Sequence, residues 1–202
     1  MGRIQMKLNR DFYLRSGLLV AKDLIGKQLV HCSPEGTTKG IIVEVEAYIG
    51  PHDAASHAFN SLNTERTAVQ YDIGGYAYIY TIYGLHTCMN VVANQKDCPE
   101  VVLIRALQPT DGIGLMEKRR QKQSIRDLCN GPGKLSQAMG ITKKHYGVDL
   151  CGDELFIETI DDTVPAISAT KRINIDYAGE AIDYPWRFIL RDSKYISVPP
   201  RR

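Results

Sequence analysis

The sequence has no long apolar run, no low-complexity tract and no internal repeat. A membrane-spanning helix needs about 20 consecutive apolar residues, and no stretch of this chain comes close to that. Residues 1–5 also lack the apolar run of a signal peptide. These absences favour a globular protein without a membrane partner, and a cytoplasmic one if the source is prokaryotic.

Cysteine is present but shows no pairing pattern. The five cysteines are odd in number and include no C-x-x-C spacing, which favours reduced thiols over a disulfide framework or a zinc site. His52, Asp53 and His57 match no strong zinc spacing either. We therefore predict no metal and no cofactor, with Cys88 and Cys129 as core residues.

The chain also lacks an excess of one charge and a linker. Its net charge is only +2, and basic clusters such as residues 118–122 are, taken singly, more typical of solvated helix faces than of a phosphate-facing stripe. Hydrophobic residues make up 44% of the 202 positions, which is enough for one core. We predict a single domain over residues 1–202.

Predicted strands dominate the first half of the chain and predicted helices the second. The strands are expected at residues 28–32, 40–49, 76–82, 87–93, 101–106, 155–158 and 187–190. The helices are expected at 18–25, 116–122 and 134–139, with Gly26 and Gly140 as stops and a capping-box variant at Ser124. This separation predicts an α+β fold, a single domain whose curved, mostly antiparallel sheet is flanked by helices.

Two carboxylates alternate along the second predicted strand. Side chains two apart share a face, so Ile42, Glu44, Glu46 and Tyr48 should lie together. A solvent-facing strand would explain the acids, but an aromatic ring beside Glu46 is more typical of a site that stacks a flat ligand and activates water.

Tyrosines form a second pattern. Tyr76, Tyr78 and Tyr80 alternate onto one face, which by itself predicts a half-buried aromatic ladder. Tyr83 and Leu85 differ because they fall at a predicted hairpin tip, where a large side chain is hard to bury. An exposed tip of this kind can enter a base stack as a wedge.

Three further residues have a structural and a functional interpretation. An isolated asparagine such as Asn90 most often forms hydrogen bonds with neighbouring backbone. Arg105, in an apolar strand, would form a buried salt bridge, with Glu46 as a candidate partner, or bind an anion. Lys134 follows a glycine-rich turn that departs from the nucleotide-triphosphate loop motif but can hold one backbone phosphate.

Taken in order, these segments resemble the alkyladenine (3-methyladenine) DNA glycosylase family. The resemblance extends from about residue 12 to the C-terminus. Each matched motif alone is weak evidence, but the set of motifs in this order is specific. It is carried by residues 43–51, 55–57, 78–84, 89–90, 103–106, 131–135, 172–173 and 185–188.

The resemblance implies a role for each matched residue. Glu46 would be the general base that deprotonates the attacking water, held with help from Arg105 and the backbone of Ile173. Tyr48 would stack on one face of a flipped base, with His57 and Tyr80 on the other. Asn90 would exclude the 2-amino group of normal guanine, and Tyr83 would fill the gap left by the extruded nucleotide.

These roles imply a monofunctional purine DNA glycosylase. It would flip alkylated or deaminated purines out of duplex DNA and hydrolyse the N-glycosidic bond with a Glu-activated water, leaving an abasic site. The partner would be double-stranded DNA containing damaged purines, and a monomer is the family-like expectation. The alternatives are a non-catalytic nucleic-acid-binding module that stacks bases on its tyrosines and a hydrolase of free nucleosides.

Overall fold

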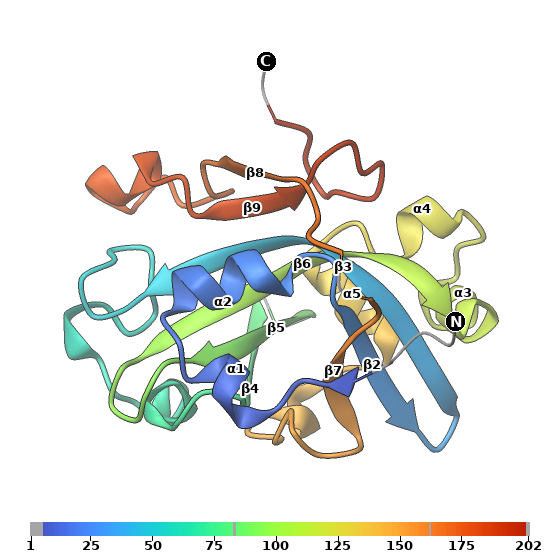
Figure 1. Ribbon diagram of the computed structural model, residues 1–202, viewed down its shortest axis with the longest axis horizontal. Coiled ribbons are helices and arrows are strands. Elements are labelled where there is room, and N and C mark those ends of the chain that lie inside the picture. The colour runs from blue at the N-terminus through green and yellow to red at the C-terminus, as the bar shows by residue number, and fades with distance from the viewer. Residues whose placement is uncertain (1–5, 83, 162, 201–202) are drawn as a thin grey trace.

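A nine-stranded sheet organises the computed structural model, which describes residues 6–82, 84–161 and 163–200 (Figure 1). Every strand pairing in it is antiparallel. The main path runs β1-β7-β2-β3-β6-β5-β4, and β9 pairs with both β3 and β8. The strands are β1 Met6–Lys7, β2 Gln28–Ser33, β3 Gly36–Ile49, β4 Ala77–Ile82, β5 His86–Ala93, β6 Glu100–Asp111, β7 Leu155–Thr159, β8 Ile167–Thr170 and β9 Arg187–Leu190.

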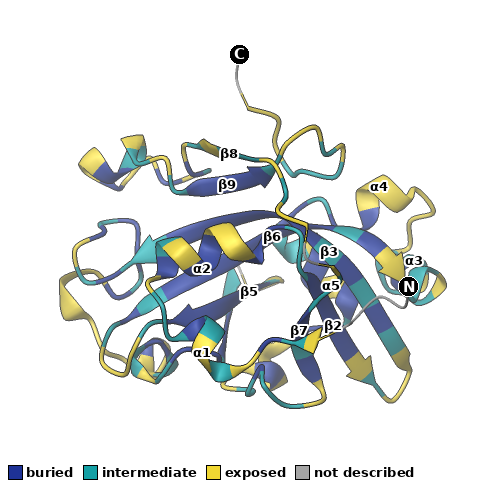
Figure 2. Ribbon diagram, viewed as in Figure 1, coloured by how far each residue is buried: buried dark blue, intermediate teal, exposed yellow. Residues whose placement is uncertain are grey.

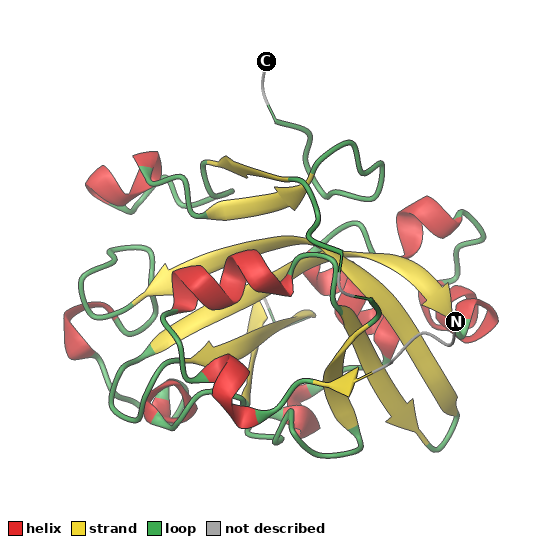
Figure 3. Cartoon of the chain, viewed as in Figure 1, coloured by secondary structure: helices red, strands yellow, loops and turns green. Residues whose placement is uncertain are grey.

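Short helices flank this sheet, which confirms the predicted α+β class (Figure 3). The α-helices are α1 Arg10–Tyr13, α2 Gly17–Leu24, α3 Ile113–Arg120, α4 Ile125–Leu128 and α5 Pro132–Met139. Four 3₁₀ turns are η1 Phe59–Ser61, η2 Ala68–Tyr71, η3 Lys143–His145 and η4 Gly179–Asp183. Both predicted stops are confirmed, because Gly26 and Gly140 adopt left-handed φ values of 84° and 75° just past α2 and α5.

Several predicted boundaries were wrong. The predicted helix 116–122 began too late, since α3 starts at Ile113, and the predicted strand 101–106 is part of the longer β6. Ser124 is the N-cap of α4, but its side chain makes no capping hydrogen bond. Three elements of four residues or fewer, β1, β8 and α1, were missed because they are too short to show a periodic pattern, whereas the four residues of β9 were predicted.

Strand β3 is the centre of the sheet. One edge pairs with β6 along most of its length, while the other pairs first with β2 and then, at Glu44–Glu46, with β9. In Figure 1 the β8–β9 pair lies along the outside of β3, to which β9 is paired. The second half of β3 is therefore enclosed by segments from the far end of the sequence.

The main core lies on one side of this arrangement (Figure 2). It joins apolar residues of α2 and α5 with the inward faces of β3, β5 and β6: Val20, Ala21, Leu24, Val45, Ala47, Met89, Val91, Val102, Ile104, Leu135, Ala138 and Met139. Cys88 and Cys129 are buried as predicted, and all five cysteines are free. Within the described residues, no helix has the length and apolar character needed to cross a bilayer.

Candidate active site

Glu44 and Glu46 are both fully buried on β3. The register with β6 shifts on either side of Glu44, which marks a bulge at this point of the strand. A bulge interrupts the alternation of side chains, and Ile42 lies in the main core together with Val45 and Ala47. The prediction that Ile42 shares the face of the two acids was therefore wrong, although the acids do turn away from the core.

The carboxylate of Glu46 accepts three hydrogen bonds. The backbone N–H of Ile173 donates to Oε1 at 2.7 Å, and the Tyr48 hydroxyl and Arg105 Nη1 donate to Oε2 at 2.8 and 3.2 Å. Burial, and next the Glu46 carboxylate, raise the pKa of Tyr48 well above 10, so its O–H remains a donor. Three bonds fix the carboxylate in one orientation.

Arg105 does not pair with Glu46 alone. Its Nε donates to Glu44 at 3.0 Å, and Arg187 and Ser197 donate to the same oxygen of Glu44, each at 2.8 Å. Burial alone would raise the pKa of Glu44, but Arg105, Ser197 and Arg187 outweigh it and lower that pKa. The predicted buried salt bridge thus exists, and it is part of a larger network.

Tyr48 forms one wall of a slot next to this network. The Arg172 guanidinium lies 4.8 Å from the centre of the Tyr48 ring and bonds to both carboxylate oxygens of Asp53. The side chains of Arg172 and Asp53 are completely buried. This ion pair supports the Tyr48 ring from behind.

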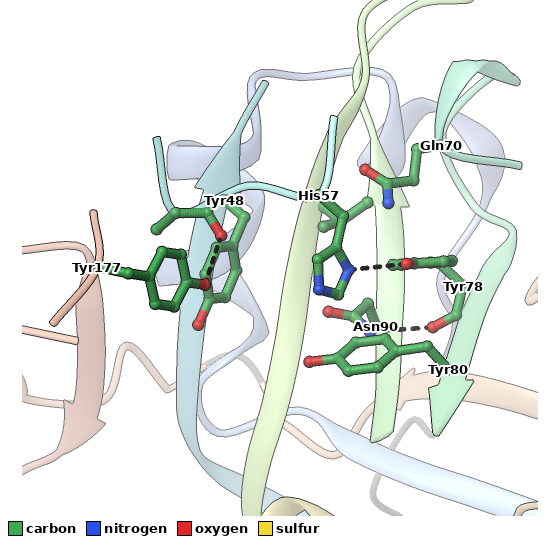
Figure 4. Close-up of a pocket in the computed structure, with 9 residues that line it drawn as sticks. Tyr48, His57, Gln70, Tyr78, Tyr80, Asn90 and Tyr177 are labelled. Carbon is green, nitrogen blue, oxygen red and sulfur yellow. Dashed lines mark hydrogen bonds between the residues drawn. The ribbon is translucent and has the colours of Figure 1, made fainter. Parts of the chain in front are cut away.

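The opposite wall consists of His57, Tyr78 and Tyr80 (Figure 4). His57 meets the Tyr80 ring edge-on at a centroid distance of 4.7 Å, and its Nδ1 lies 2.8 Å from the Tyr78 hydroxyl. Burial, and next the charge of Arg66, lower the pKa of His57 from 6.5 to about 4. The imidazole is therefore neutral at physiological pH.

Polar groups complete the slot. The Asn90 amide donates to the backbone carbonyl of Tyr78 at 3.0 Å, so the side chain ties down backbone as one interpretation expected. Figure 4 shows Asn90 beside Tyr80 and Gln70 beyond Tyr78, with Tyr48 and Tyr177 across the opening. These residues line one cavity with His57, and a flat aromatic ligand is the shape it suits.

The predicted wedge is only partly described. Tyr83 lies outside the described residues, whereas Leu85 at the same hairpin tip is 83% exposed. Lys134 lies in the first turn of α5, where its ammonium donates to Asn130 at 2.9 Å.

In the described part of the chain, one group of three side chains has the spacing of metal ligands: His31, His145 and Glu154. Nδ1 of His145 accepts from the backbone N–H of Thr142 at 2.9 Å and lies 3.1 Å from the Thr142 carbonyl. Its Nε2 lies 3.6 Å from Glu154, beyond hydrogen-bond distance. Nδ1 of His31 lies 2.6 Å from the Met139 carbonyl, so backbone contacts hold both imidazoles and we base no metal site on this group.

Sequence patterns missed several residues of the site. Asp53 was considered only as a metal ligand, and Arg172 was included in a segment of the family resemblance without a role of its own, because their pairing spans 119 positions. Gln70 lies in the turn η2 and shows no periodicity. Residues 187 and 197 approach Glu44 only through the docking of β9, which no local pattern indicates.

Comparison with known proteins agrees with the family resemblance of the sequence. Residues 11–194 match the model of the methylpurine-DNA glycosylase family. A relative from Clostridium novyi, provisionally named a 3-methyladenine DNA glycosylase, is 48% identical over 201 residues, covering 95% of this chain and 98% of the relative. One of the same name from Bacillus subtilis is 45% identical over 197 residues, covering 98% and 100%. The chain therefore belongs to the methylpurine-DNA glycosylase family, whose members are hydrolases of N-glycosidic bonds.

Proposed function

We propose that the chain removes alkylated or deaminated purines, 3-methyladenine among them, from duplex DNA by hydrolysing the N-glycosidic bond. The observation that carries this proposal is the fully buried Glu46, hydrogen-bonded at both oxygens and adjacent to the aromatic slot. A buried carboxylate is costly unless it is paired. A protein that only bound nucleic acid would gain nothing from the Glu46 carboxylate, since its negative charge repels phosphate.

The slot supports base flipping. A base inside a duplex cannot be attacked at its sugar, so the enzyme must first turn it out, which costs a few kcal/mol and less for damaged bases. Tyr48 on one side and His57 with Tyr80 on the other would stack on the extruded base. An alkylated purine carries positive charge, which electron-rich rings attract and a neutral His57 does not repel.

The Glu46 carboxylate would accept a proton from water as that water attacks the sugar carbon. Its charge would also stabilise the positive charge that develops on the sugar. The Ile173 N–H is occupied by Glu46, so the Ile173 carbonyl is the backbone atom that would accept a bond from the water. Since no lysine is among the described residues that line the slot, we expect hydrolysis to an abasic site without a covalent enzyme–DNA intermediate.

Other contacts follow from the same proposal. Asn90 would reject the 2-amino group of ordinary guanine, Tyr83 and Leu85 would occupy the gap in the stack, and Lys134 would hold a backbone phosphate. We expect a monomer that binds duplex DNA. Because bacterial chromosomes lie in the cytoplasm, an enzyme with this substrate would act there.

A test of the proposal is excision by Glu46→Gln. Duplex oligonucleotides that each carry one lesion are incubated with excess enzyme, with and without EDTA, and released bases are quantified. Wild type should release free purine, while Glu46→Gln should release almost none yet still bind the lesion duplex. Full single-turnover activity in the variant, or a DNA adduct trapped by borohydride, would contradict the mechanism.

A further inference from the structure

Gln70 has an unusual place in the slot. It lies in η2, its side chain is completely buried, and neither its amide nitrogen nor its carbonyl oxygen makes a hydrogen bond of normal geometry among the described residues. The amide is near the Tyr78 hydroxyl, whose pKa is raised by burial and lowered by Arg66 and Gln70. An unpaired buried donor and acceptor each carry a desolvation cost, and such groups are rare in folded proteins. Two in one side chain therefore point to a ligand that pairs with them.

The cavity is where that ligand would sit. Several buried polar side chains lack a partner in the described part of the chain, but of these only Gln70 lines the cavity shared by Tyr48, Tyr80 and Asn90. In Figure 4 its amide group is directed toward the His57–Tyr78 hydrogen bond. Asn90 differs, because its amide is already bonded to backbone.

The chemistry of the amide defines what it can read. A glutamine presents one carbonyl acceptor and two N–H donors, and it can rotate by half a turn to exchange them. It therefore complements a purine edge on which an N–H donor lies next to a lone-pair acceptor, as it does when glutamine reads adenine in DNA. 3-Methyladenine keeps such an edge, and so does hypoxanthine.

We propose that Gln70 is a specificity-determining residue that pairs with this donor–acceptor edge of the flipped base. The inference rests on the proposed function and narrows its substrate class to purine lesions that keep the edge intact. In 1,N6-ethenoadenine the etheno bridge occupies N1 and N6, so no N–H donor remains there. A site built to hydrogen-bond one base discriminates strongly against an analogue that leaves its polar groups unpaired.

The test compares hypoxanthine and 1,N6-ethenoadenine in otherwise identical duplexes under single-turnover conditions. Wild type should excise hypoxanthine faster. Methionine has a similar length but no amide. Gln70→Met should therefore lower the rate of hypoxanthine excision relative to that of 1,N6-ethenoadenine by about tenfold. If wild type and Gln70→Met are both active and have the same ratio of rates, the role of Gln70 is overturned but the proposed function is not. If wild type is inactive on every lesion, the proposed function is overturned as well.

Ser136→Ala is a matched control. The Ser136 hydroxyl is also buried and unpartnered, but it lies on α5 and does not line the cavity, so its removal should leave the ratio unchanged. If Gln70→Met does not fold, competition on the wild type gives a second measurement. Free hypoxanthine should inhibit excision at lower concentration than free 1,N6-ethenoadenine, and equal inhibition would overturn the inference.

Discussion

The hydroxyl of Tyr48 donates a 2.8 Å hydrogen bond to the carboxylate of Glu46, two residues earlier on the same strand. The residue proposed to stack on the base thus also orients the residue proposed to activate water. A small displacement of the Tyr48 ring would be transmitted directly to the carboxylate. In the proposed mechanism, binding and chemistry would be coupled through one side chain.

Tyr48→Phe separates these two roles, because phenylalanine keeps the ring and loses the donor. We expect single-turnover excision to fall roughly tenfold, the effect of losing one hydrogen bond to a charged group, with little change in affinity for a lesion duplex. Tyr13→Phe is the control, since the buried Tyr13 hydroxyl has no hydrogen-bond partner among the described residues and Tyr13 does not line the slot. Equal rates for wild type and Tyr48→Phe would show that the bond does not orient Glu46.

Asp53→Asn breaks the buried ion pair behind Tyr48. Removing one partner of such a pair leaves an uncompensated charge, so we expect the free energy of unfolding to drop by about 3–5 kcal/mol in urea titrations. Asp183→Asn breaks the exposed pair with Lys171 and should cost no more than about 1 kcal/mol. Similar losses in the two variants would mean that the buried pair contributes little.

His57 predicts a pH dependence of stability. Its pKa is about 4 in the folded protein and near 6.5 in an unfolded chain, so between these values the unfolded state binds more protons. Stability should therefore fall as the pH is lowered through this window, and His57→Gln should flatten the decline. Burial also lowers the pKa of His31, which accounts for a residual slope. Parallel pH profiles for wild type and variant would exclude this contribution of His57.

Leu85→Ala tests the hairpin tip. The side chain is 83% exposed, so its truncation should leave the melting temperature unchanged. If Leu85 enters the base stack, duplex binding should weaken while binding to single-stranded DNA stays the same. Filter-binding or anisotropy titrations with both substrates measure this, and equal losses on the two would argue against insertion.

Local patterns were sufficient for the parts of the site that lie on one strand. The spacing of Glu46 and Tyr48, and the shared face of Tyr78 and Tyr80, follow from the period of two in a strand, and the structure places them as neighbours. The bulge at Glu44 has no such signal, because it depends on the register with β6. This is why Ile42 was placed on the wrong face.

Contacts between segments that are distant in sequence could not be predicted from local patterns. Arg172 supports Tyr48 only after the chain has brought residue 172 back to Asp53, and nothing near either residue indicates that partner. Gln70 is unremarkable in sequence, and its importance arises from burial without a partner. The resemblance of the whole chain identified the residues proposed to act on the substrate, but not the residues that hold them in place.

The docking of β9 has a consequence for partly folded states. Arg187 and Ser197 supply three of the four side-chain or backbone groups that bond to Glu44, and they come from 143 and 153 positions further along the chain. In a species in which the segment from Arg187 to Ser197 is detached, the carboxylates of Glu44 and Glu46 would share the single guanidinium of Arg105. Water would then enter and solvate them. Such a species should have no excision activity, so an incompletely folded molecule would release no bases from DNA.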